Sequence, residues 1–143
     1  MAANNVESFR AAHSAFNNRD FDGAIGELAE GAIYEDHARS VRFTGPEEFR
    51  QFMEAWVTVF PDARITEAVY MDAGDTVISE FTGTGTNTGP IGPHPPTGRT
   101  MKLHFCEVMR YNAEGKAVSG GIYYDQLSML QQLGLISAEA AAG

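Results

Sequence analysis

The first 60 residues carry apolar side chains at the spacing of amphipathic helices. A helix is expected over residues 4–18, because positions three or four apart lie on one helix face. The residues on that face are Val6, Phe9, His13 and Phe16. A second short helix is expected after Asp20, whose side chain suits the N-cap position.

A third helix is expected to begin at Thr44. Thr44 can cap the helix, Glu47 can close a capping box, and Pro46 is tolerated in the first turn. A wide apolar stripe follows, formed by Phe49, Phe52, Met53, Trp56 and Phe60. Pro61 and Asp62 then end this helix.

The rest of the chain has the alternating pattern of strands. A short strand is expected over residues 32–37, with Tyr34 and Asp36 on one side and His37 on the other. Four longer strands are expected over residues 63–71, 76–86, 99–111 and 116–124. A last short helix is expected over residues 126–133, closed by Gly134.

Helices followed by mostly antiparallel strands predict an α+β fold, with the helices packed on one face of the sheet. Glycine pairs at 83/85 and 120/121 can bend the strands around a small core. Such a curved sheet, closed by the N-terminal helices, forms a cone that encloses a pocket. We expect a single domain over residues 1–143, with its core at about 6–135 and a flexible tail over 136–143.

Charge and composition narrow the range of partners. Ten basic and nineteen acidic residues give a net charge of −9, which disfavours nucleic acid and anionic membranes as partners. No apolar run approaches the roughly 18 residues of a membrane span, and no signal pattern opens the chain, so we expect a cytoplasmic protein. With one cysteine, Cys106, and scattered histidines, no metal site is expected.

Ionisable groups on apolar strand faces are the candidates for chemistry, since burial shifts a carboxyl group toward proton transfer at working pH. Glu107 shares a face with Phe105 and Met109. It is a functional carboxylate, an exposed residue at the sheet edge or the partner of a buried arginine. His104 lies on the opposite face by parity, and Glu80 stands within a second apolar strand.

Several motifs together resemble one family. The segment 83–89, GTGTNTG, is followed by PPTGR at 95–99, and YDQLS at 124–128 is followed by QLGL at 132–135. These pieces, with FPD at 60–62 and FTG at 43–45, resemble the SnoaL-like polyketide cyclases over roughly residues 9–135.

This resemblance implies the cone-shaped fold of the nuclear-transport-factor-2-like superfamily, also described as a cystatin-like α+β barrel. It implies a cofactor-independent intramolecular aldol condensation on a polyketide ester, with an aspartate as general acid/base. Asp125 matches that aspartate, although it can equally be the N-cap of the last helix, and the residue three positions earlier, Ile122, cannot titrate.

We therefore predict a small hydrophobic ketone or polyketide as the substrate. The predicted catalytic residues are Asp125, Glu107, His104 and His37. The predicted substrate-binding residues are Tyr34, Asp36, Trp56, Glu80, Phe105, Met109 and Tyr123. His13 has two interpretations: a core or interface histidine, or a ligand or catalytic residue.

Two other functions fit the same sequence. One is a ligand-binding or dimerisation module that keeps the fold without catalysis, and the other is a different lyase, isomerase or hydrolase that uses the same pocket. A homodimer or higher homo-oligomer is expected in each case, because apolar residues occur on both faces of the later strands.

Overall fold

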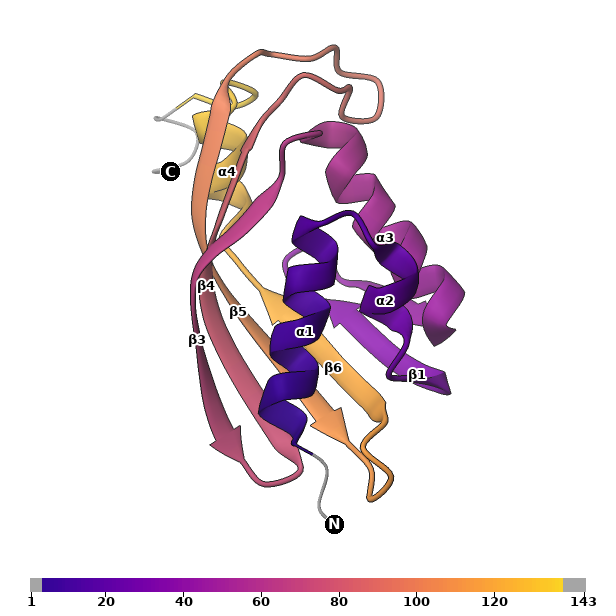
Figure 1. Cartoon of the computed structure of the whole chain (residues 1–143). Coiled ribbons are helices and arrows are strands. Elements are labelled where there is room, and N and C mark those ends of the chain that lie inside the picture. The colour runs from indigo at the N-terminus through magenta and orange to yellow at the C-terminus, as the bar shows by residue number, and fades with distance from the viewer. Residues whose placement is uncertain (1–3, 138–143) are drawn as a thin grey trace.

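A six-stranded curved sheet carries three helices on its inner face in the computed structural model, which describes residues 4–137 (Figure 1). The helices are α1 (Asn5–Asn17), α2 (Phe21–Ile25), α3 (Gly45–Val59) and α4 (Gln126–Gln132). The strands are β1 (Leu28–Asp36), β2 (Val41–Thr44), β3 (Arg64–Ala73), β4 (Thr76–Thr86), β5 (Thr100–Tyr111) and β6 (Ala117–Tyr123).

The strand order is β2-β1-β6-β5-β4-β3, and every neighbouring pair is antiparallel except β1 and β6, which run parallel. The expected α+β fold is therefore confirmed. Strand β2 was not expected from the sequence, because it has only four residues and forms the edge of the sheet beside β1. The predicted tail beyond Ser137 lies outside the described residues.

Side-chain parity on the strands separates a buried face from an outer one. Residues of β5 alternate strictly between buried and more exposed positions, so that Phe105, Glu107 and Met109 point inward as predicted. The inner residues of β4, which include Ser79 and Phe81, are also buried. Both strands therefore present one continuous wall to the helices.

Curvature arises at breaks in the strand register. The pairing of β3 with β4 shifts between Thr66 and Val69, where Glu67 has a positive φ of 55°. The β4–β5 register is unbroken through Gly83 and Gly85. These glycines instead leave room for the rings of Phe105 and Phe60, which a Cβ atom would meet.

The capping predictions have mixed outcomes. Asp20 and Asp125 cap α2 and α4 as expected from their positions. Thr44 is the N-cap residue of α3, but its side chain makes no capping bond and the box with Glu47 is absent. Glu48, one position later, accepts the hydrogen bond from the Thr44 backbone N–H at 2.9 Å, which satisfies that donor instead.

Candidate active site

A cavity lies between the inner face of the sheet and the helices α1, α2 and α3. Its volume is about 110 Å³, and its walls are mainly aromatic and aliphatic. The aromatic residues of the lining are Phe9, Phe16, Phe49, Phe52, Trp56, Phe81, Phe105 and Tyr111. Such a site suits a small apolar molecule oriented by few polar groups.

Two adjoining ionisable side chains, His13 and Glu107, line this cavity. His13 Nε2 lies 2.7 Å from Glu107 Oε1, and the Tyr34 hydroxyl donates to Glu107 Oε2 at 2.5 Å. On its other side, His13 Nδ1 lies 2.7 Å from the Tyr70 hydroxyl. These four side chains form one continuous hydrogen-bonded cluster, the His13–Glu107 cluster.

The cluster is assembled from four elements that are far apart in the sequence. His13 comes from the inner face of α1, Tyr34 from β1, Tyr70 from β3 and Glu107 from β5. Strand register explains the alignment, because Ser79 on β4 pairs with both Tyr70 and Glu107 in its neighbouring strands. The site is therefore a property of the tertiary fold and not of a local motif.

Burial gives the cluster its electrostatic character. Tyr34, Glu107 and His13 are 2%, 6% and 7% exposed. Burial raises the pKa of Tyr34 well above its usual value, and the charge and hydrogen bond of Glu107 act in the same direction. The Tyr34 hydroxyl therefore keeps its proton at neutral pH and donates a hydrogen bond to Glu107.

Aromatic rings fix the orientation of the imidazole. The His13 ring centroid lies 4.6 Å from that of Phe9 and 5.1 Å from that of Phe81. With both nitrogens hydrogen-bonded, the ring has little freedom to turn. The arrangement can hold a carboxylate and an adjacent proton donor at the cavity wall, which are the two groups that carbon-acid chemistry needs.

Asp125 lies outside this cavity. Its exposed carboxylate caps α4, accepting from Ser128 N at 3.0 Å and from Ser128 Oγ at 2.7 Å. These hydrogen bonds hold the pKa of Asp125 below its usual value. The N-cap alternative raised from the sequence is confirmed, and the side-chain hydrogen bonds of Asp125 go to Ser128 and not to the His13–Glu107 cluster.

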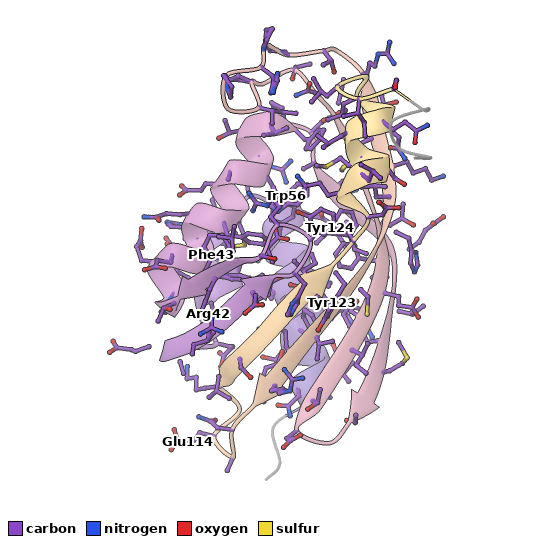
Figure 2. All side chains as sticks on the ribbon, turned by 180° about the vertical axis from the view of Figure 1, so that it is seen from behind. Arg42, Phe43, Trp56, Glu114, Tyr123 and Tyr124 are labelled. Carbon is purple, nitrogen blue, oxygen red and sulfur yellow. The ribbon has the colours of Figure 1, made fainter. Side chains whose placement is uncertain are left out.

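The predicted residues His104 and Glu80 lie on the outer face of the sheet. His104 Nε2 and Glu80 Oε1 are 2.9 Å apart, and both side chains are substantially exposed. His37 and Tyr123 stack on each other with ring centroids 4.2 Å apart. Tyr123 is 48% exposed on β6, on the side of the molecule shown in Figure 2. None of these four side chains lines the cavity.

Asp36 is fully buried, but it organises the turn after β1. Its carboxylate accepts from Arg39 Nε at 2.8 Å and from the Tyr124 hydroxyl at 2.9 Å. Figure 2 shows Trp56 near Tyr124, whose ring centroids are 5.4 Å apart. Trp56 lines the cavity, as Phe105 and Met109 do, so these three residues have the predicted placement.

Two members of the cluster were missing from the predicted site residues. His13 was recognised as part of an apolar helix face, but nothing in the sequence indicates that Glu107 lies opposite it. Tyr70 carried no signal, because strand β3 contains the register shift that decides its direction. A polar side chain in an otherwise apolar helix stripe, as at His13, was the one available indication.

The described part of the chain holds no group of three or more histidine, cysteine, aspartate or glutamate side chains arranged for a metal ion. Across residues 4–137, no helix combines the length and the apolar character that crossing a membrane requires.

The curved sheet and its helices have the α+β fold of nuclear-transport-factor-2-like and ketosteroid isomerase-like structures. The chain belongs to the family of SnoaL-like polyketide cyclases, whose model matches residues 7–133. No curated protein matches the chain at a significant level.

Solved structures share the fold at low sequence identity. A proposed hydroxylase from Streptomyces galilaeus, AclR, is 22% identical with a TM-score of 0.82, covering 96% of this chain and 100% of that one. A proposed polyketide cyclase from Pseudomonas putida is 25% identical with a TM-score of 0.80, covering 92% and 98%. A ketosteroid isomerase-like protein from Catenulispora acidiphila, solved with trimethylamine, is 22% identical with a TM-score of 0.77, covering 90% and 92%.

Proposed function

We propose that this protein is a cofactor-independent enzyme that catalyses an intramolecular aldol condensation on a small apolar carbonyl compound. One observation carries the proposal: a buried carboxylate, hydrogen-bonded to a histidine and a tyrosine, lies at the wall of an apolar cavity. The family assignment supports a cyclase-like activity. Glu107, rather than Asp125, is the general base in this proposal.

Glu107 retains the capacity to act as a base in this arrangement. A carboxylate has about four lone-pair sites, and Tyr34 and His13 occupy one on each oxygen. In the proposed reaction a free lone pair takes the proton from a carbon next to the substrate carbonyl. The resulting enolate carbon attacks a second carbonyl carbon, a C–C bond forms, and the new alkoxide takes its proton back from Glu107.

The cavity also suggests the charge of the substrate. Glu107 and Glu27 line the cavity against one arginine, Arg64, so an anionic substrate would meet net repulsion there. The aromatic walls would also give its charge little solvation. We therefore propose a neutral, ring-forming ketone or polyketide ester, with its acidic carbon placed beside Glu107. His13 lines the cavity beside the same carboxylate, and its Nε2–H is the donor that we propose for the developing oxyanion.

The test is turnover of an aromatic polyketide ester by Glu107→Gln. Loss of the base should lower kcat by about 10²–10⁴-fold, the usual contribution of a general base. Glu80→Gln, which alters an exposed carboxylate, is the matched control and should keep wild-type turnover. Asp125→Asn should also remain active. Full activity of Glu107→Gln would refute the assignment of Glu107 as the base. Loss of turnover in Asp125→Asn would instead indicate a catalytic site at the end of β6.

A ligand-binding module without catalysis is the second candidate. It is favoured by the observation that both oxygens of Glu107 are already hydrogen-bonded within the protein. Calorimetry with the same ester distinguishes the two candidates. A binding module binds the ester without consuming it, so the wild type and Glu107→Gln both leave the ester to react at the uncatalysed rate. An enzyme releases a cyclised product that mass spectrometry of the mixture detects.

We also propose that the protein forms a homodimer through the outer face of the sheet. Exposed apolar residues on that face of β3 and β6 support this, with Val69 55% and Met71 41% exposed. Light scattering should give twice the 15.5 kDa chain mass. Val69→Lys with Met71→Glu should convert the dimer to a monomer, and a wild-type monomer at micromolar concentration would refute the proposal.

A further inference from the structure

Ser79 Oγ is fully buried and makes no well-formed hydrogen bond. Its polar neighbour is the Tyr70 hydroxyl, with which its interaction is weak. An orphaned buried hydroxyl is unfavourable, so its presence beside the proposed active site needs a reason. Ser79 pairs with Tyr70 on one side and with Glu107 on the other in the strand register. It therefore adjoins the tyrosine that contacts His13.

The proton positions in the cluster explain what Tyr70 does at rest. Glu107, when ionised, only accepts hydrogen bonds, so neutral His13 carries its proton on Nε2. His13 Nδ1 is then an acceptor and takes the hydrogen of the Tyr70 hydroxyl. Burial raises the pKa of Tyr70, and the charge of Glu107 acts in the same direction, while Arg10 and a weak hydrogen bond with Ser79 act in the opposite one.

A second proton on His13 reverses this hydrogen bond. Protonated Nδ1 becomes a donor, so the Tyr70 oxygen must accept, and the tyrosine hydrogen must turn to another acceptor. Ser79 Oγ is the unpaired acceptor beside it. The orphaned hydroxyl is thus the partner that the cluster needs in its other protonation state.

The charges around His13 are few. Glu107 faces it from β5, and Phe81 and Phe9 cover its ring from β4 and α1. Arg10, paired with Glu7 at 3.3 Å, lies over the Tyr70 ring at 4.6 Å. Tyr34 reaches His13 only through Glu107.

We propose that Tyr70 and Ser79 are positioning residues that keep His13 fully hydrogen-bonded in both its neutral and its protonated states. The tyrosine hydrogen points to His13 Nδ1 in the first state and to Ser79 Oγ in the second. This inference rests on the proposed function for its purpose, because it lets His13 exchange a proton during turnover. The hydrogen-bond exchange itself is measurable without any substrate.

The experiment is a pH titration of the histidine ring nitrogens by ¹⁵N NMR, with His13 assigned from the spectrum of His13→Gln. The neutral form should carry its proton on Nε2. Ser79→Ala should keep that tautomer, because it removes an unpaired hydroxyl, but it should make the second protonation of His13 harder by about tenfold, the effect of one lost hydrogen bond. Ser14→Ala, on the exposed side of α1, is the matched control.

Tyr70→Phe makes the test specific. Because Ser79 acts through the Tyr70 hydroxyl, Ser79→Ala should have no further effect on His13 in the Tyr70→Phe background. A shift below threefold for Ser79→Ala, a neutral His13 that is protonated on Nδ1, or equal effects of Ser79→Ala in both backgrounds would each overturn the proposal. If the protein turns out to lack turnover, the titration still decides the inference, so the two failures are distinguishable.

Discussion

Replacing Glu107 by leucine tests whether the His13–Glu107 cluster is one coupled unit. Leucine is an apolar side chain without oxygens, so the substitution leaves the Tyr34 hydroxyl and His13 Nε2–H without acceptors. Both donors are buried, at 2% and 7% exposure for their residues. Water therefore has little access to replace the lost carboxylate.

The number of orphaned donors sets the expected loss in the free energy of unfolding. Each orphaned buried donor costs about 1–3 kcal/mol, so Glu107→Leu should lower the free energy of unfolding by about 2–6 kcal/mol. Tyr34→Phe alone removes one hydrogen bond to a charged group, which contributes about 1.5–3 kcal/mol. In the double variant only His13 is orphaned, so its loss should be smaller than the sum of the two single losses by at least about 1 kcal/mol.

Urea unfolding, followed by the fluorescence of the single tryptophan, Trp56, measures each free energy. Tyr123→Phe is the control partner, because Tyr123 lies on the outer face and should combine additively with Glu107→Leu. Additive losses for Tyr34→Phe and Glu107→Leu would refute the coupling, and so would a Glu107→Leu protein as stable as the wild type.

Three further predictions follow from single groups. Burial raises the pKa values of Tyr34, Tyr70, Tyr111 and Tyr124, so the stability that their neutral forms contribute is present below pH 10 and is lost as pH rises through the raised values. Tyrosinate absorbance at 295 nm should therefore rise together with unfolding, and ionisation of these groups below pH 10 would contradict this. Burial also raises the pKa of the Cys106 thiol, with Glu80 and Glu107 acting in the same direction. At pH 8 Cys106 should therefore react with a disulfide reagent more slowly than glutathione does, and the two rates should become equal only when urea unfolds the protein. Asp125→Ala should lower the melting temperature without lowering turnover. Hydrogen bonds from Ser128 lower the pKa of Asp125, so the stability from capping is present above about pH 4 and disappears as pH falls through the lowered pKa. A difference in melting temperature that does not change with pH would contradict this capping role.

The sequence predicted the fold well where local patterns decide it. Strand β4 was expected at its observed bounds, and the inward direction of Glu107 followed from its parity with Phe105 and Met109 on β5. Both signals depend on a residue's immediate neighbours, which the chain itself contains. The apolar face of α1 was predicted on the same basis, with Phe9 and His13 buried on it.

The composition of the site could not be predicted in the same way. Glu107 and His13 are 94 positions apart, and their contact depends on how α1 packs across the sheet. The resemblance to a family placed Asp125 at the end of the last strand, where a helix cap gives an aspartate a sufficient local role. A sequence pattern alone does not separate such a cap from a base, because both favour aspartate at the same position.

The cluster ties the function of the protein to the packing of one helix. Tyr34, Tyr70 and Glu107 come from strands of one sheet, whose hydrogen bonds hold their relative positions, whereas His13 comes from α1, which crosses that sheet (Figure 1). A shift of α1 by 1 Å would disturb the two 2.7 Å contacts of His13 while leaving the Tyr34–Glu107 bond in place. The aromatic contacts of Phe9 and Phe81 with His13 oppose such a shift. The packing of the apolar face of α1 on the sheet therefore sets the distance between Glu107, the proposed base, and His13, the proposed donor to the oxyanion.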